Sequence, residues 1–194
     1  LIHTDLKPEN ILINKKTFEI KIIDFGSALE KEKIKYNNFY LCTRYYRAPE
    51  LAYNLYFNEK IDIWSIGCII IELISGKPLY IPKNELELIE FTNDLLGTPT
   101  LLEYTASEKY KQLFLDNDKK LPIYNEPYCF DIKFDKYLIK RKFTKIQQTH
   151  LKDLYKSILT YNLFNRYSAS ECLNNPIFLQ KKLNFMPSSQ PEML

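Results

Sequence analysis

One segment, IDIWSIGCIIIELI at residues 61–74, constrains the fold of this 194-residue chain more than any other. Drawn as a helix, it is apolar on almost every face, and a helix of that kind is buried in a protein core. Asp62 and Glu72 enclose only nine residues, far fewer than a membrane span needs. Gly76 and Pro78 provide the signal that ends the helix. The segment therefore predicts a central buried helix in a sizeable, α-rich domain.

Two short runs of β-prone residues lie near the start of the chain. Residues 11–13 (ILI) and 18–23 (FEIKII) are separated by the polar residues 15–17, a pattern that predicts a short hairpin. Residues 27–47 show little apolar periodicity. A loop of that length inside a compact domain is usually functional or disordered.

Two capping boxes predict helix starts. Asn84 followed by Glu87 opens a helix that extends to about Leu96, and Ser168 followed by Glu171 opens a shorter one. A third, amphipathic helix is indicated around residues 151–159, where apolar side chains recur at helical spacing.

Residues 100–145 carry the weakest pattern, and their last part is basic. Six Lys or Arg residues and a single acid lie between residues 133 and 145. The segment could bind phosphate or nucleic acid, but a solvated face of loops and helices is the interpretation we favour. A net charge of +3 is too small to indicate a nucleic-acid binder, so we expect no direct nucleic-acid partner.

Composition narrows the class of protein. The chain is 45% hydrophobic and 26% charged, which is typical of a globular domain. Its four cysteines include no C-x-x-C pair, and only two histidines are present, so we expect neither a zinc site nor a disulfide framework. Reduced thiols and the lack of a visible signal peptide favour an intracellular protein with no membrane partner.

The stretch HTDLKPEN at residues 3–10 gathers Asp5, Lys7 and Asn10 on one loop, and Asp24 follows the predicted hairpin. Phosphoryl transfer needs oxygen ligands for Mg²⁺, a cation near the phosphates and a carboxylate that orients the attacking hydroxyl. The hairpin would bring these four side chains together. They are therefore candidates for a phosphoryl-transfer site.

Three motifs occur in a fixed order: H-x-D-L-K-P-E-N at residues 3–10, D-F-G at 24–26 and A-P-E at 48–50. With the DIWSIG helix, this set resembles the C-terminal lobe of a eukaryotic protein kinase. The resemblance covers residues 1–180 and leaves 181–194 as a tail. It implies a protein kinase-like α+β fold, mainly an α-helical C-lobe with a small hairpin at the catalytic loop, and with the N-lobe absent.

The resemblance also implies roles at the site. Asp5 would be the catalytic base, and Lys7 would steady the transferring phosphate. Asn10 and Asp24 would bind Mg²⁺ and, together with Lys7, the phosphates of ATP. The implied cofactors are therefore ATP and Mg²⁺, and the catalytic loop and the activation segment would span residues 3–10 and 24–50.

Four further residues receive supporting roles from the resemblance. Thr43 would bond to the catalytic Asp and Lys of the loop. Glu50 and Arg166 would form a buried ion pair, although residues 162–165 (NLFN) depart from the D-P-x-x that usually precedes this arginine. Asp62 would hold the backbone of the catalytic loop.

The subfamily signals point to the CMGC group, closest to LAMMER (CDC-like) and dual-specificity tyrosine-regulated kinases. Thr4 favours LAMMER, where that position is commonly Thr. Tyr40 tilts the other way, because MAP and tyrosine-regulated kinases carry an activating tyrosine there, and residues 87–97 match the LAMMER name motif poorly. We favour LAMMER, which implies arginine/serine-rich splicing factors as substrates and a nuclear location, with the cytoplasm as an alternative.

Thr4 also carries a prediction about regulation. Most kinases have an arginine there that pairs with a phosphate on the activation segment, and Thr4 cannot form that ion pair. Arg44 and Arg47 remain as candidate anchors for a phosphorylated Tyr40. The alternative is that Tyr40 is an ordinary exposed aromatic residue. We predict that Tyr40→Phe in the full-length enzyme lowers turnover by less than about tenfold, and a larger loss would refute the idea.

The implied function is that of an ATP-dependent protein Ser/Thr kinase, with dual specificity as a variant. The sequence upstream of Asp5 contains no Gly-rich loop, strand lysine or helix glutamate. We therefore expect these 194 residues to be inactive by themselves. The alternative is a pseudokinase or scaffold that binds partners without catalysis.

Overall fold

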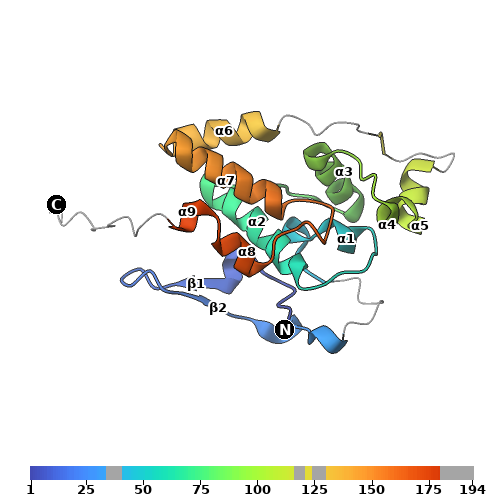
Figure 1. Ribbon diagram of the computed structural model, residues 1–194. Coiled ribbons are helices and arrows are strands. Elements are labelled where there is room, and N and C mark those ends of the chain that lie inside the picture. Colours follow the sequence, from blue (N-terminus) through green and yellow to red (C-terminus); the bar gives the residue numbers. More distant parts are fainter. Residues whose placement is uncertain (34–40, 116–120, 124–129, 180–194) are drawn as a thin grey trace.

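The computed structural model describes residues 1–33, 41–115, 121–123 and 130–179, and Figure 1 shows helices stacked above one small sheet. The longer helices are α2 (Lys60–Ser75), α3 (Glu85–Leu96), α6 (Phe130–Lys140) and α7 (Lys145–Ile158). The shorter ones are α1 (Pro49–Ala52), α4 (Leu102–Thr105), α5 (Glu108–Tyr110), α8 (Ala169–Leu173) and α9 (Pro176–Leu179). Single 3₁₀ turns lie at Pro8–Asn10, Phe25–Ser27, Lys31–Lys33 and Arg44–Tyr46, and a π-helical turn lies at Lys111–Leu115.

Helix α2 is the buried centre that its sequence predicts, and it extends one residue further at each end than predicted. Trp64 and Cys68 are fully buried. Gly67 allows α7 to approach closely, because a Cβ at that position would lie 2.6 Å from Ile158 Cγ2. Gly76 ends the helix in the left-handed conformation (φ 82°) that glycine adopts without strain.

The two predicted capping boxes differ in the structure. At α8 both halves are present: the Ser168 hydroxyl accepts from the Glu171 N–H, and the Glu171 carboxylate accepts from the Ser168 N–H. At α3 the Asn84 side chain accepts from the Glu87 N–H, but the Glu87 carboxylate accepts from the N–H of Lys83. The helix start was predicted correctly, whereas the second half of its box is displaced by one residue.

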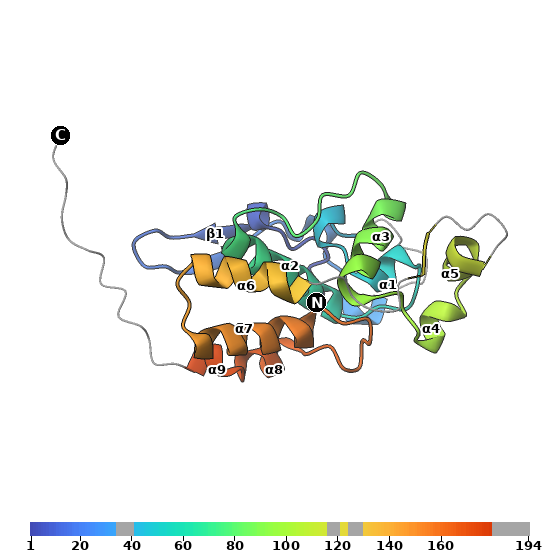
Figure 2. The same ribbon diagram turned by 90° about the horizontal axis from the view of Figure 1, so that it is seen from above.

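Helices α6 and α7 lie alongside each other (Figures 1 and 2). Helix α7 begins six residues before the predicted segment, because Thr144 and Gln147 form a complete capping box that the sequence analysis missed. Helix α6 lies in the segment for which no element was predicted. Its Phe134 packs edge-on against Tyr155 of α7, with the ring centroids 4.8 Å apart.

Most described side chains of the basic segment at residues 133–145 are exposed to solvent, and one of them, Arg141, has a structural role. Lys136, Lys140, Lys142 and Lys145 are exposed. Arg141 instead donates its Nε–H to the carbonyl of Ile74 at 2.9 Å and so caps the last turn of α2. This arrangement favours the interpretation as a solvated face over a dedicated binding site for phosphate or nucleic acid.

Strands β1 (Ile11–Ile13) and β2 (Ile20–Ile22) form the predicted antiparallel hairpin, with Ile11 opposite Ile22. Its large apolar side chains stay exposed: Leu12, Ile13, Phe18, Ile20 and Ile22 are 44–64% accessible. The register places Ile13, Ile20 and Ile22 on one face of the hairpin, and exposed apolar side chains on one face are typical of an interaction surface. No helix in the described part of the chain is long and apolar enough to cross a membrane.

Candidate active site

The loop at residues 3–10 is held in place by the first turn of α2. Asp62 accepts hydrogen bonds from the backbone N–H groups of His3 (2.7 Å) and Thr4 (2.9 Å). Burial raises the pKa of Asp62, and these two bonds offset only part of that rise. Asp62 therefore has the position expected for a residue that holds the catalytic-loop backbone.

Thr4 is fully buried and adopts a left-handed backbone conformation with φ 68°. That conformation is unusual for a β-branched residue and costs on the order of 1–3 kcal/mol, so the surrounding contacts must hold it. Its hydroxyl donates to the carbonyl of Ser27 at 2.9 Å, and the bond joins the catalytic loop to the segment that follows D-F-G. The sequence analysis gave Ser27 no role, although it directly follows D-F-G.

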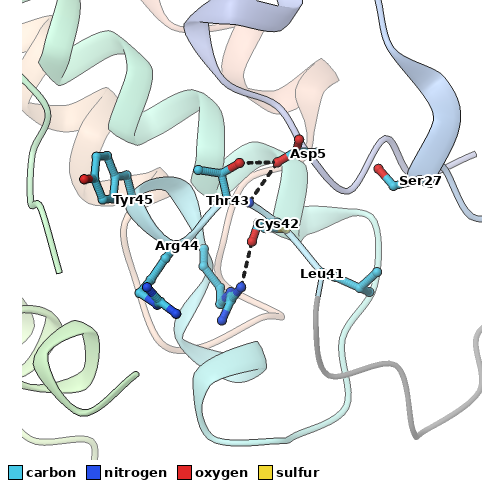
Figure 3. A pocket seen from close by; sticks show the side chains of 8 residues that line it. Asp5, Ser27, Leu41, Cys42, Thr43, Arg44 and Tyr45 are labelled. Atoms are coloured by element: carbon cyan, nitrogen blue, oxygen red, sulfur yellow. Dashed lines mark hydrogen bonds between the residues drawn. The ribbon is translucent and has the colours of Figure 1, made fainter. Parts of the chain in front are cut away.

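The carboxylate of Asp5 is oriented by two segments that are far apart in the sequence. Its Oδ1 accepts from the backbone N–H of Thr43 at 2.8 Å and from the Thr43 hydroxyl at 2.7 Å (Figure 3). Its Oδ2 accepts from the ammonium of Lys7 at 2.6 Å, and that ammonium also lies 3.2 Å from the Thr43 hydroxyl. The bonds that the resemblance implied among these three residues are present.

The contact between Asp5 and Lys7 stabilises the charged form of both side chains. Burial raises the pKa of Asp5, but the hydrogen bonds from Lys7 and Thr43 outweigh burial, so the pKa lies below its ordinary value. The hydrogen bond to Asp5 raises the pKa of Lys7. Asp5 therefore stays ionised and Lys7 protonated at neutral pH, and the Asp5 carboxylate can accept a hydrogen bond from a hydroxyl group.

Asn10 and Asp24 are brought together by the hairpin. The Ile23 N–H donates to the Asn10 carbonyl at 2.9 Å, which places Asp24 directly beyond the end of β2. Asn10 is buried, and its amide nitrogen donates to the backbone carbonyl of Asp5 at 2.8 Å. Asp24 is exposed, and its backbone adopts the left-handed conformation with φ 63°.

Asn10 and Asp24 offer side-chain oxygen atoms, which are the ligands that Mg²⁺ prefers. The nitrogen of the Asn10 amide is engaged by the loop, which leaves its oxygen as the group for a ligand, and the Asp24 carboxylate is open to solvent. The described residues contain no group of three or more His, Cys, Asp or Glu that could hold a metal by itself. Mg²⁺ typically takes one or two protein oxygens and completes its shell with phosphates and water, so the residues present fit this ion.

Contacts of His3 fix the position of the D-F-G segment. His3 Nε2 lies 2.9 Å from the Ile23 carbonyl, and its ring lies 4.9 Å from the ring of Phe25. Backbone hydrogen bonds between Ile2 and Leu29 continue the contact along the chain. The loop at residues 3–10 and the segment that begins at Asp24 are thus joined at several points.

A pocket of about 460 Å³ opens beside Asp5. It is lined by Asp5, Ser27, Leu41, Cys42, Thr43, Arg44, Tyr45 and Arg47 (Figure 3). One wall is thus the segment before A-P-E, and the Asp5 carboxylate also lines the pocket. The pocket is large enough to receive part of a peptide next to the Asp5 carboxylate.

The two arginines in that wall already have partners. Arg47 donates to the Glu85 carboxylate at 2.6 Å and to the Cys42 carbonyl at 2.8 Å, and Arg44 donates to the Lys83 carbonyl at 2.9 Å. A phosphate would have to compete with these acceptors. Tyr40, the proposed site of that phosphate, lies outside the described residues.

The pair expected between Glu50 and Arg166 is present and bidentate, with nitrogen–oxygen distances of 2.6 and 2.9 Å. Both side chains are almost completely buried, at 1% and 0% exposure. Arg166 also donates to the carbonyls of Thr160 and Lys60, and its guanidinium lies over the Trp64 ring at 5.1 Å. The pair joins the end of the activation segment to the segment after α7.

The unusual residues 162–165 still form an ordered turn. The Asn162 side-chain oxygen accepts from the N–H groups of Phe164 (2.9 Å) and Asn165 (3.1 Å). Its backbone carbonyl accepts from the Arg166 N–H. Asn162 therefore supplies the turn that a proline-containing sequence would otherwise provide.

Comparison with known proteins decides the family. Residues 1–178 match the sequence profile of the protein kinase domain. The chain belongs to the protein kinase family. It is 30% identical to the serine/threonine-protein kinase RIM11/MSD1 of Saccharomyces cerevisiae over 184 residues, which are 94% of this chain and 45% of that kinase. The family predicted from the motifs is thereby confirmed.

Two further relatives belong to the same broad group. Mitogen-activated protein kinase 20 of Arabidopsis thaliana is 36% identical over 202 residues, 97% of this chain and 30% of that kinase. Homeodomain-interacting protein kinase 1 of Caenorhabditis elegans is 42% identical over 125 residues, 63% of this chain and 15% of that kinase. The chain is thus homologous to CMGC Ser/Thr kinases and spans less than half the length of each of these three relatives. None of these three is named as a LAMMER or tyrosine-regulated kinase.

Proposed function

We propose that this chain is the C-terminal lobe of an ATP-dependent protein Ser/Thr kinase. The observation that carries the proposal is the carboxylate of Asp5, which Lys7 and Thr43 orient at the edge of an open pocket. A carboxylate held this way can position a substrate hydroxyl and accept its proton. Lys7, still protonated, stands where it would stabilise negative charge on the transferred phosphate.

Asn10 and Asp24 would hold Mg²⁺ together with the phosphates of ATP. When bound, Mg²⁺ neutralises the negative charge of those phosphates. The chain's own contribution is to keep both side chains next to Asp5, through the bond from Asn10 to the Asp5 carbonyl and the bond from Ile23 to Asn10.

The exposed hairpin supports the assignment to one lobe. Ile13, Ile20 and Ile22 share one face of the hairpin and are 44–64% accessible, although isoleucine is normally buried. Another part of a kinase would cover this surface and supply the remaining contacts to ATP. We therefore propose that residues 1–194 alone do not transfer phosphate.

The metal requirement gives a direct test of this function. In the full-length product of the gene that encodes this chain, Asp24→Asn should lower Mg²⁺-dependent transfer from ATP by about tenfold or more, because asparagine lacks the charge that holds the cation. Raising the Mg²⁺ concentration should recover part of the loss. The control is Glu19→Gln on the same hairpin, which should leave the rate unchanged. An unchanged rate in Asp24→Asn would contradict the metal assignment.

The substrates we propose are proteins with acceptor Ser or Thr residues, and by resemblance the location is intracellular. The LAMMER subfamily, with arginine/serine-rich splicing factors in the nucleus, rests on Thr4 alone. Arg44 lines the pocket next to Asp5 and donates to a neutral carbonyl, so its positive charge disfavours an arginine beside the acceptor residue. A peptide array on the full-length protein, comparing acceptors with and without neighbouring arginines, would decide between these substrates.

A scaffold that binds partners without catalysis is the second candidate. The observation in its favour is the exposed apolar surface of the hairpin, which a partner could cover. Against it, the four positions that phosphoryl transfer would use carry residues suited to that chemistry: Asp5, Lys7, Asn10 and Asp24. Binding of ATP without turnover would favour the scaffold.

A further inference from the structure

A second pocket lies beside the buried Glu50–Arg166 pair, with Glu50 in its lining. Its volume is about 270 Å³, near the lower limit for ligand sites, so it suits one large side chain with its neighbour better than a drug-sized molecule. Three segments build it: α1 with the loop that follows it, helix α4, and the turn after α7. The lining residues are Glu50, Leu55, Tyr56, Asn58, Glu103, Tyr104, Tyr161, Leu163 and Phe164.

The floor of this pocket is preformed. Tyr104 and Tyr161 are buried, and their rings meet edge-on with centroids 5.1 Å apart. The Tyr161 hydroxyl lies 2.8 Å from the side-chain oxygen of Asn93 and 3.0 Å from the carbonyl of Gly97. A ligand would therefore meet an aromatic floor whose polar ends are already satisfied.

The rim of the pocket is apolar and exposed. Phe164 is 91% accessible and Tyr56 is 54% accessible. The backbone of Phe164 is fixed by its bond to Asn162, so the ring is presented to solvent by an ordered turn. Phe164 lies in the NLFN sequence that departs from the usual kinase pattern. Exposed aromatic rings around a small pocket are typical of a docking site for an apolar anchor.

The charge of the lining is one-sided. Two carboxylates line the pocket and none of its lining residues is basic. Glu50 is neutralised by Arg166, whereas Glu103 is exposed at the rim. The ammonium of nearby Lys60 donates to the backbone carbonyls of Leu163 and Phe164, so it lies beside the turn after α7, whereas Glu103 belongs to α4. A positive group next to an apolar anchor would complement Glu103 and the aromatic faces.

We infer that this pocket docks a segment of a partner protein that presents an aromatic side chain next to a lysine or arginine. The ring enters between Tyr104 and Phe164, and the adjacent cation meets Glu103. The inference depends on the lining of the pocket and not on kinase activity, so it stands or falls separately from the proposed function.

Three short peptides test the inference on the full-length protein. Saturation-transfer difference NMR would measure the binding of acetyl-GGFKGG-amide, of the charge-reversed GGFEGG and of the anchorless GGAKGG. The expected result is that the Phe-Lys peptide binds about tenfold or more tightly than either of the others. Equal binding of the Phe-Lys and Phe-Glu peptides would overturn the charge argument, and equal binding of the anchorless peptide would overturn the pocket.

Two variants place the binding in this pocket. Phe164→Ala and Glu103→Gln alter exposed side chains, so both variants should keep the fold. Each should weaken the Phe-Lys peptide, and Glu103→Gln should abolish its advantage over Phe-Glu. The matched controls are Ile139→Ala, an exposed apolar residue on α6, and Glu19→Gln on the hairpin; neither should change binding. Undiminished binding in Phe164→Ala would place the peptide elsewhere and contradict the inference.

Discussion

Replacing Asp5 by asparagine in the full-length protein should lower the turnover of phosphoryl transfer by about 10²–10⁴-fold, the usual contribution of a general base. Asparagine can still accept hydrogen bonds from Thr43, so the loop should keep its shape. It cannot take up the proton of a substrate hydroxyl, and it removes the charge that pairs with Lys7. The measurement is the initial rate of phosphate incorporation into a serine peptide.

Two comparisons separate this effect from damage to the fold. Binding of ATP with Mg²⁺ should be retained in Asp5→Asn, because the proposed metal ligands are Asn10 and Asp24. Glu19→Gln, which alters an exposed carboxylate on the hairpin, should leave turnover unchanged. A loss smaller than about tenfold in Asp5→Asn would mean that another group is the base.

Replacing Arg166 by methionine should lower the free energy of unfolding by about 3–5 kcal/mol. The substitution leaves the carboxylate of Glu50 buried at 1% exposure without its bidentate partner. It also frees the carbonyls of Thr160 and Lys60. Urea unfolding followed by circular dichroism would measure the change by linear extrapolation.

The exposed pair of Lys31 and Glu59 is the matched control for that experiment. Its side chains are 58% and 45% accessible, so Lys31→Met should change stability by about 1 kcal/mol or less. The double variant Glu50→Leu with Arg166→Met should recover much of the loss, since it removes both buried charges. If Arg166→Met cost no more than Lys31→Met, the buried pair would not have the structural role assigned to it.

Local patterns in the sequence predicted the parts of the fold that local physics determines. The all-apolar run around Trp64 could only be a buried helix, and the box at Ser168 and Glu171 defines a helix start within four residues. Helix α6 was missed because its stability depends on contacts such as Phe134 on Tyr155, which are distant in the sequence. The capping box at α3 was also predicted incompletely. The path of the chain before α3 brings the N–H of Lys83, and not that of Asn84, to the Glu87 carboxylate.

In the candidate site, too, some residues could be predicted from local sequence and others could not. Asp5, Lys7, Asn10 and Asp24 could be named from motifs, because one loop and one hairpin carry them. Their partners could not all be found from local pattern. Ser27 contacts Thr4 across 23 positions and Glu85 contacts Arg47 across 38, and neither stands in a motif that the sequence analysis used. The second pocket combines three segments and is visible only once they are folded together.

The most direct test of the whole account is one phosphate-transfer assay with radiolabelled ATP, Mg²⁺ and a generic basic protein substrate. The account predicts Mg²⁺-dependent incorporation into Ser or Thr by the full-length protein, loss of that incorporation on chelation of the metal, and none by the 194-residue chain alone. Incorporation by the isolated chain would contradict the assignment to one lobe. A full-length protein that binds ATP with Mg²⁺ but transfers nothing would contradict the assignment as a kinase and support a scaffold.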